Sequence, residues 1–304
     1  MSAVIDKGQG SRDLPGLALA LGGAIAFSGK AIIVKLAYRH GVDAVTLIML
    51  RMAFALPLFL VMAWWAGRGQ AALTARDWLG VCGLGFSGYY LSSFLDFVGL
   101  QYITASLERL IMYLTPTLVL VLGSLMYRRS WRRAQAAGMA VSYVGVLLVF
   151  GQELKLEGSN VPLGALLVFA STVSYALYLV FSGEFVKRIG SLRLVGLATS
   201  VACICCIAQF VLLRPVGSAF TVAPEVVALS VLNATLCTAV PVLLVMMAIE
   251  RVGPAATAQA GMVGPLSTIL LGVWLLGEPF TGWLAAGTLL VLAGIFVFSR
   301  SGRS

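Results

Sequence analysis

The chain is built from long apolar runs that follow one another with only short polar breaks between them. An α-helix needs about 20 apolar residues to cross the ~30 Å hydrocarbon core of a bilayer. Turn-forming or charged clusters such as Arg68-Gly69-Gln70 and Arg214-Pro215 separate the runs. We therefore predict ten transmembrane helices, at residues 15–37, 44–66, 78–100, 103–126, 134–151, 162–184, 193–213, 224–249, 253–276 and 281–299.

Composition supports lipid as the solvent for most of the surface. Hydrophobic residues make up 60% of the 304 residues and charged residues only 11%. An ordinary soluble domain has roughly 45–50% apolar and about 25% charged residues. Ten spans leave a polar tail at residues 1–14 and short loops, so no separate soluble domain is expected. The predicted fold class is an all-α integral membrane protein.

The net charge of +9 would suggest nucleic acid as the partner of a soluble protein. Here the cations lie mostly in the loops. With the N-terminus in the cytoplasm, fourteen Lys and Arg residues fall on the cytoplasmic side and four on the other. This is the positive-inside bias of membrane proteins. We expect both termini in the cytoplasm, a location in a bacterial inner (plasma) membrane, lipids as partners and no nucleic acid.

Few residues suit metal or cofactor chemistry. All five cysteines lie in apolar runs, and the single histidine, His40, lies in a loop. Cys203, Cys205 and Cys206 are close in sequence but have no nearby His or acidic residue to complete a metal site. The segment Ser28-Gly29-Lys30-Ala31 lacks the other residues of a phosphate-binding loop. We expect no metal and no cofactor. An intramembrane enzyme and a channel remain alternatives to a transporter.

An internal repeat becomes visible when the chain is shifted by 149 residues. Without gaps, Pro116 then falls on Pro265, and three glycines on three glycines: Gly123 on Gly272, Gly138 on Gly287 and Gly145 on Gly294. The two halves, 15–151 and 162–299, each contain five predicted helices. Because five is odd, the second half enters the membrane from the opposite side. Such inverted repeats are typical of secondary transporters, whose substrate site lies near the midplane between the halves.

These features resemble a known family. The proline-containing fourth and ninth helices, the glycine-bearing fifth and tenth, and Leu276-Gly277-Glu278-Pro279 are similar to EamA-type members of the drug/metabolite transporter superfamily. Within it, the chain is similar to the aromatic amino acid exporter branch. The resemblance implies export of small metabolites such as amino acids by alternating access. The first half has Arg128-Arg129 where the second has Gly277-Glu278, so any role of that acidic residue does not carry over to the first half.

Charged residues within the spans are candidates for the site, because each costs roughly 2.5–3.5 kcal/mol at a helix centre. We single out Lys30, Asp96, Glu108 and Arg109, together with Arg51. At about 1.5 Å per residue, all five lie roughly 5–15 Å from the non-cytoplasmic ends of their spans. One interpretation is a substrate site or an outer gate. The other is a structural ion-pair network or side chains that reach the headgroups, which suits Arg51 best.

Polar aromatic side chains deep in the spans are candidates for the walls of the site. They are Tyr89, Tyr113, Tyr175 and Tyr178, and Gln259 adds a polar group on the ninth helix. A buried tyrosine hydroxyl needs a partner, although helix packing explains each ring equally well. Pro116 and Pro265 free backbone carbonyls and permit kinks, so both are candidate hinges. We expect a small-molecule substrate, an amino acid or related metabolite, and a monomeric protein.

Overall fold

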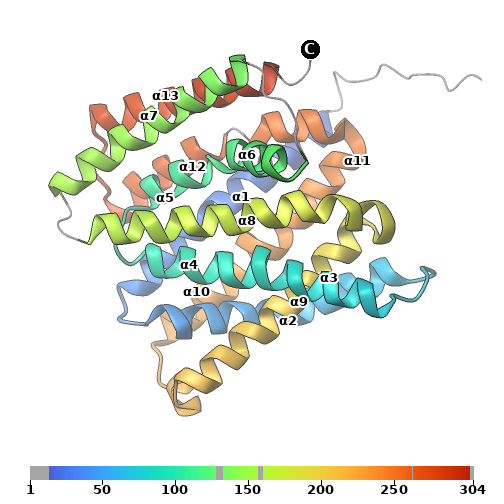
Figure 1. The fold of residues 1–304 in the computed structure, drawn as a ribbon. Helices are drawn as coiled ribbons and strands as arrows, with labels where there is room; N and C mark the ends of the chain where they lie inside the picture. Colours follow the sequence, from blue (N-terminus) through green and yellow to red (C-terminus); the bar gives the residue numbers. More distant parts are fainter. Residues whose placement is uncertain (1–13, 128–132, 157–159, 262, 302–304) are drawn as a thin grey trace, which may run out of the picture.

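The computed structural model describes residues 14–127, 133–156, 160–261 and 263–301. Every regular element in these ranges is a helix (Figure 1). Their bounds are α1 Leu14–Tyr38, α2 Ala44–Gly67, α3 Ala75–Gly85, η1 Phe86–Leu91, α4 Ser92–Gly99, α5 Ala105–Met112, α6 Thr115–Tyr127, α7 Arg133–Leu156, α8 Val161–Ile189, α9 Ser191–Leu213, η2 Val216–Phe220, α10 Pro224–Ala234, η3 Thr235–Ala239, α11 Val240–Gly261, α12 Gly264–Leu271, η4 Gly272–Leu276 and α13 Gly282–Ser301.

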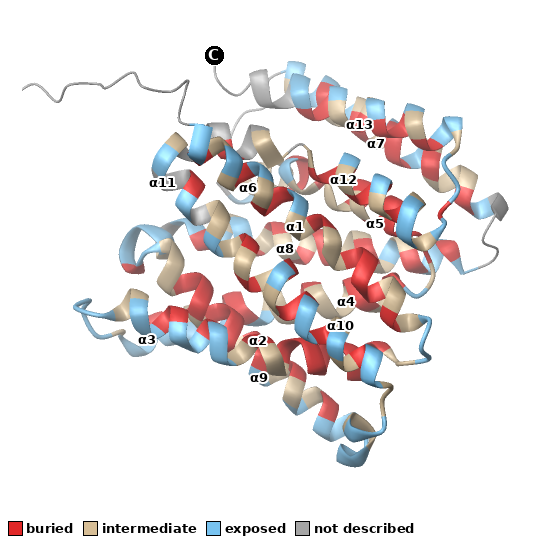
Figure 2. Cartoon of the chain, turned by 180° about the vertical axis from the view of Figure 1, so that it is seen from behind, coloured by how far each residue is buried: buried red, intermediate tan, exposed pale blue. Residues whose placement is uncertain are grey.

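The helices have the length and apolar character that a bilayer requires. Within the described residues, seven helical segments are long and apolar enough to span a membrane. The segment α3–η1–α4, the one ending in α12–η4, and α13 complete the predicted ten. Exposed residues lie on the outward faces and ends of the helices, while buried ones gather in the middle of the bundle (Figure 2). Many of the exposed residues are large and apolar, including Trp274 at 80% exposure. The all-α membrane fold class is confirmed.

The polar break predicted at residues 250–252 is instead part of a helix, since α11 continues from Val240 to Gly261. The chain still reverses direction between Val245 and Gly264. Gly23 of α1 faces Val245, and Gly29, further along α1, faces Cys237. The segment 237–245 therefore runs antiparallel to α1. Further along, α12 and η4 contact α1 in the opposite order. The eighth and ninth spans are therefore two crossings, as predicted, joined by helical rather than irregular backbone.

The helix contacts made by one half are repeated by the corresponding helices of the other half, as a two-fold symmetry axis between the halves requires. Helix α1 packs on α11 as α4 packs on α8, while α2 pairs with α9 and α7 with α13. The helices also share a local irregularity. Both the third and the eighth spans contain a π-helical segment, η1 and η3, and these begin 149 residues apart. The end of the bundle where α1 begins and α13 ends is the terminal end, and the opposite one, with loops 39–43, 100–104 and 277–281, is the distal end (Figure 1).

Glycines of the repeat meet where α7 crosses α13. A Cβ atom on Gly145 would lie 2.6 Å from the carbonyl oxygen of Gly287, and one on Gly294 would lie 2.5 Å from that of Gly138. The two contacts are equivalent, because exchanging the halves turns one into the other. The glycine spacing thus serves close helix packing, and the inverted repeat predicted from it is confirmed.

The two repeat prolines occupy the same place in the backbone. Pro116 is the second residue of α6, after a break at Tyr113–Leu114, and Pro265 is the second residue of α12. Their side chains differ, since Pro116 is exposed and Pro265 is buried. Proline suits the first turn of a helix because it has no N–H to satisfy. Both prolines therefore begin a new helical segment.

Candidate functional site

Three of the predicted residues form one buried ionic cluster. Lys30 on α1 places its Nζ 2.7 Å from Asp96 Oδ2 on α4 and 3.4 Å from Glu108 Oε1 on α5. The carboxylate side chains are 1% and 0% exposed, and the lysine side chain is 16% exposed. A single ammonium group thus faces two carboxyl groups from the third and fourth spans. Ions in such a place need each other, because hydrocarbon offers them no partner.

The hydrogen bonding of this cluster is incomplete. Apart from the ion pair with Lys30 and the contact between the two carboxyl groups, neither Glu108 Oε1 nor Oε2 has a hydrogen-bond donor within the described part of the chain, and Asp96 Oδ1 is in the same position. Leaving a buried polar atom without a partner costs about 1–3 kcal/mol. Unsatisfied buried acceptors next to a cation are a typical sign of a binding site rather than of a completed structural network.

Arg51 belongs beside this cluster, although the sequence favoured a role at the headgroups for it. Its side chain is 5% exposed, and its guanidinium lies 5.0 Å over the ring of Phe97. Asp96 is within electrostatic range of it. Its Nε and Nη1 have no hydrogen-bond acceptor among the residues described. Of the two structural interpretations of Arg51, the one in which it reaches the lipid headgroups is wrong, because α2 begins at Ala44, as predicted, about two turns before Arg51, and the side chain is buried.

Arg109 and Tyr113 do not contact the ionic cluster. Arg109 donates hydrogen bonds from Nε to Thr268 Oγ1 and from Nη2 to the carbonyl of Phe27, both at 3.0 Å. Tyr113 donates its hydroxyl to the carbonyl of Gly261 at 2.6 Å. These bonds fasten α5 to α1 and to the ninth span. The structure thus uses both side chains to hold helices together at the boundary of the halves.

The other tyrosines form a second cluster. The hydroxyls of Tyr89 and Tyr178 lie 3.2 Å apart, with their rings edge to face, and the Tyr175 ring stacks on Tyr178 with centroids 5.7 Å apart. Tyr89 precedes Asp96 by seven residues, about 10 Å along a helix. The aromatic cluster therefore lies nearer the terminal end than the ionic cluster does. Gln259 is within α11, but its side chain lies outside the described part of the structure.

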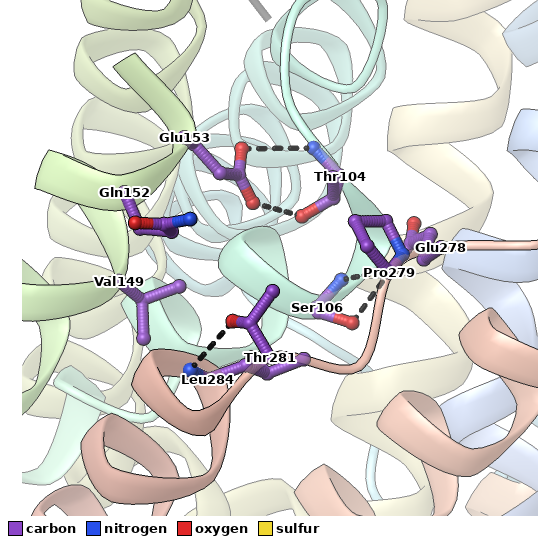
Figure 3. Close-up of a pocket in the computed structure, with 9 residues that line it drawn as sticks. All are labelled: Thr104, Ser106, Val149, Gln152, Glu153, Glu278, Pro279, Thr281 and Leu284. Atoms are coloured by element: carbon purple, nitrogen blue, oxygen red, sulfur yellow. Dashed lines mark hydrogen bonds between the residues drawn. The ribbon is translucent and has the colours of Figure 1, made fainter. Parts of the chain in front are cut away.

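Two carboxylates that the sequence analysis did not place in the site close the distal end of α5 (Figure 3). Glu278 accepts hydrogen bonds from Ala105 N at 2.7 Å, Ser106 N at 3.2 Å and Ser106 Oγ at 2.6 Å. Glu153 on α7 accepts hydrogen bonds from the N–H and hydroxyl of Thr104. The first N–H groups of a helix lack partners within it and favour negative charge. Both carboxylates therefore stabilise the start of α5.

The acidic residue of Leu276-Gly277-Glu278-Pro279 thus has a local structural explanation. Gly277 adopts a φ of 72°, a conformation that favours glycine, and this turns the chain so that Glu278 points at α5. The start of α5 has a sequence signal, because Thr104 precedes an apolar helix as an N-cap residue does. The contribution of Glu278, from a distant loop, has no such signal. A cavity of about 30 Å³ lies between Thr104, Ser106, Glu153 and Glu278.

The described residues contain no group of three His, Cys, Asp or Glu side chains placed to hold a metal ion. Cys203 and Cys206 are buried beside Arg51, and Cys203 Sγ lies 3.6 Å from Met52 Sδ. These thiols fill space between α9 and α2. The chemistry of the site is accordingly that of ammonium, guanidinium and carboxyl groups in a dry layer.

Known proteins match this chain along most of its length. The EamA-like transporter family matches it twice, at residues 14–151 and 162–300. An uncharacterized transporter of Bacillus subtilis (strain 168), YcbK, is 29% identical over 84% of this chain and 83% of its own. An uncharacterized transporter of Archaeoglobus fulgidus is 24% identical over 90% of this chain and 93% of its own. A solved crystal structure with 19% identity shares the fold, with a TM-score of 0.63 over 95% of this chain and 97% of that one. The chain therefore belongs to the EamA-like transporter family: it is a multi-pass membrane transporter of a small-molecule substrate and not an enzyme.

Proposed function

We propose that this protein exports small zwitterionic metabolites, such as amino acids, by alternating access between its two halves. The substrate site is the layer that holds Lys30, Asp96, Glu108 and Arg51. Both termini face the cytoplasm of a bacterial cell, so the distal end faces outward. The tail at residues 1–14 precedes two repeat units, 15–151 and 162–299, that move relative to each other.

The observation that carries this proposal is the coexistence of unused acceptors and unused donors in one buried layer. Glu108 offers two oxygens whose partners are limited to the Lys30 ammonium and the Asp96 carboxyl group, and Arg51 offers two nitrogens without an acceptor among the described residues. An α-amino acid presents an ammonium and a carboxylate on one carbon atom. Its ammonium would satisfy Glu108 and its carboxylate would satisfy Arg51 or Lys30, which removes the cost of the unsatisfied atoms. A solute with a single charge offers a charged partner to only one side.

Alternating access follows from the burial of this layer. Since Asp96 and Glu108 are 1% and 0% exposed, a solute reaches them only when helices move. Inverted repeats can exchange conformations and so open opposite faces in turn. The π-helical segments η1 and η3 and the helix starts at Pro116 and Pro265 provide bending points in corresponding places. Tyr89, Tyr175 and Tyr178, and the ninth span with Gln259, line the inward part of the path and suit an aromatic or apolar substrate side chain.

The test is uptake of labelled amino acids into proteoliposomes, with and without an excess of the same amino acid inside. We expect saturable flux that is accelerated by internal substrate, because a carrier reorients faster when loaded. Flux that stays linear with concentration would indicate a channel. In the variant Glu108→Gln we expect at least about tenfold lower flux at matched protein amounts. Arg76→Gln, an exposed cation at the start of α3, is the control and should transport normally.

A further inference from the structure

A second polar cavity lies at the distal end, apart from the ionic cluster. It has a volume of about 690 Å³ and is bounded by the last turns of α1, the 100–104 connection and residues 276–279. We term it the vestibule. Its charged lining residues are Lys35, Arg39, Asp43 and Glu278, with Tyr38 and Gln101 between them.

The carboxylates of the vestibule are already engaged by the protein. Asp43 caps α2, where it accepts hydrogen bonds from Val45 N, Thr46 N and Thr46 Oγ1 at 3.0, 3.3 and 2.6 Å. Arg214 Nη2 lies 3.4 Å from Asp43 Oδ1, the oxygen that also accepts the two backbone hydrogen bonds. Glu278 accepts three hydrogen bonds at the start of α5. Neither carboxylate is therefore available as the principal partner of a solute.

The cations of the vestibule, in contrast, retain unused donors. Lys35 Nζ donates one hydrogen bond, to the carbonyl of Ile103 at 3.0 Å, and Arg39 Nη2 donates one to the carbonyl of Leu276 at 2.5 Å. An ammonium group has three N–H donors and a guanidinium has five. Lys35 lies in the last turn of α1 and Arg39 directly follows the helix, and both line the vestibule. Two cations with free donors thus face one cavity.

The lining charges of the vestibule balance, because Lys35 and Arg39 face Asp43 and Glu278. Arg214 lies outside the lining and pairs with Asp43, and the positive end of the α5 dipole offsets Glu278. Snorkelling to lipid does not explain the cations, since Lys35 reaches the 100–104 connection and Arg39 reaches the end of η4. The free donors of these two cations, beside carboxylates that are already engaged, favour an anion.

We propose that the vestibule is a recognition site for the carboxylate group of the exported solute, with Lys35 and Arg39 as its ligands. This inference rests on the proposed export function. Lys35 follows Lys30 by five residues, about 7.5 Å of helix rise, so a carboxylate released by Lys30 finds the next cation within a short step. The vestibule is then the last binding station before release.

The test measures the local potential and does not require the substrate to be known. The variant Gln101→Cys places a thiol in the vestibule, in a background that carries Cys82→Ser because Cys82 is exposed. Two methanethiosulfonate reagents, the anionic ethylsulfonate and the cationic ethyltrimethylammonium, then modify it at low salt. Their rate ratio cancels differences in thiol reactivity. We expect Lys35→Gln with Arg39→Gln to lower the anionic-to-cationic ratio at least about fivefold. Asp43 and Glu278 remain in that variant, and the background without Gln101→Cys corrects for other cysteines.

The source of the anion is tested in the same system. Sodium benzoate should slow modification of Gln101→Cys, while benzamide should not, and the benzoate effect should vanish with Lys35→Gln and Arg39→Gln. These outcomes should be the same in phosphatidylcholine nanodiscs with or without phosphatidylglycerol. An unchanged reagent ratio, or equal protection by benzamide, overturns the proposal. Suppression of the anionic reagent by phosphatidylglycerol alone also overturns it, because the vestibule would then hold a lipid headgroup. A positive result without amino acid flux would leave the vestibule standing and refute the export function.

Discussion

Tyr178 lies across Gly88, so closely that a Cβ atom on the glycine would overlap the tyrosine ring. The repeat contains the same contact in reverse: Cys237 lies against Gly29. Residues 29 and 178, like 88 and 237, are 149 positions apart. Each of the two crossings thus has one glycine, and both glycines, Gly29 and Gly88, come from the first half. The consequence is an aromatic contact between α8 and η1 and a close glycine–cysteine contact beside Lys30 between α1 and η3.

The variant Gly88→Val should be destabilised by about 1–3 kcal/mol, because the added side chain overpacks the contact with Tyr178. The expected result is a lower Tm in detergent. Gly83→Val is the matched control, since nothing lies within 4 Å of a Cβ at that position of the preceding α3. Adding Tyr178→Ala to Gly88→Val should recover part of the lost stability. If the control loses as much as Gly88→Val, steric overlap is not the cause.

Glu278→Gln should lower stability by roughly 1–3 kcal/mol, since the amide group replaces one acceptor oxygen by a donor that faces other donors. Chemical denaturation followed by tryptophan fluorescence measures it. Ser106→Ala, which removes one of the three donors, should cost less. Glu225→Gln, an exposed acid in the first turn of α10, is the control. Equal stability of Glu278→Gln and the wild-type protein would contradict the assignment of Glu278 as a cap of α5.

Arg109 and Glu108 are adjacent in sequence and should respond differently to substitution. Arg109→Met removes two buried hydrogen bonds between helices, so it should lower stability by about 1–3 kcal/mol, while the protein that remains folded transports normally. Glu108→Gln removes the weaker, 3.4 Å ion pair of Lys30 but leaves Lys30 paired with Asp96 at 2.7 Å and keeps an oxygen acceptor at position 108, so its Tm should change less than that of Arg109→Met while flux is lost. Measuring Tm and flux on the same preparations separates the two roles. The reverse pattern would assign Glu108 to the structural network and Arg109 to the path.

Asp43 makes part of the stability dependent on pH. Burial alone would raise the pKa of this carboxyl group, but hydrogen bonds from Thr46 and the charge of Arg214 outweigh it and hold the pKa below its ordinary value. A carboxyl group with a lowered pKa stabilises the folded state above its unfolded pKa of about 3.9, and this contribution is lost as the pH falls through the folded value.

Asp43→Ala should therefore cost about 1 kcal/mol at pH 7, the usual cost of removing an N-cap. The difference from the wild-type protein should shrink below about pH 4. Unfolding midpoints measured between pH 3 and pH 7 provide the comparison. A difference that stays constant over this range would show that the charge of Asp43 contributes nothing.

Much of the architecture was predictable from the sequence, because lipid imposes long apolar helices and the repeat leaves matching prolines and glycines. The contacts of Gly145 with Gly287 and of Gly294 with Gly138 follow the predicted register. The exception in the helices is the break expected near Arg251, where α11 remains helical. Arg251 and Gly253 are polar and flexible enough for a loop, but their backbone hydrogen bonds continue the helix.

The sequence indicated which residues gather in the site better than it indicated how they contact one another. Depth along each helix indicated correctly that Lys30, Asp96 and Glu108 could share a layer, and the structure brings them together. Periodicity on one helix does not specify how that helix is rotated against its neighbours, so the hydrogen bonds of Arg109 to Thr268 and Phe27, rather than to the cluster, were not predicted. Glu278 lies in a different half from its partner Ser106, and no local pattern predicts such a pairing.

The π-helical segment η1 determines which way Asp96 points. A π-helical turn holds one residue more than an α-helical turn, as if a residue had been inserted into the span. Each residue advances an α-helix by about 100°, so deleting one residue from Phe86–Leu91 would turn Asp96 away from Lys30 by that angle. The eighth span has the corresponding segment η3. Both spans should consequently be intolerant of insertions and deletions on the terminal side of these segments. Point substitutions would not reveal this sensitivity. Length, as much as residue identity, keeps the ionic cluster assembled.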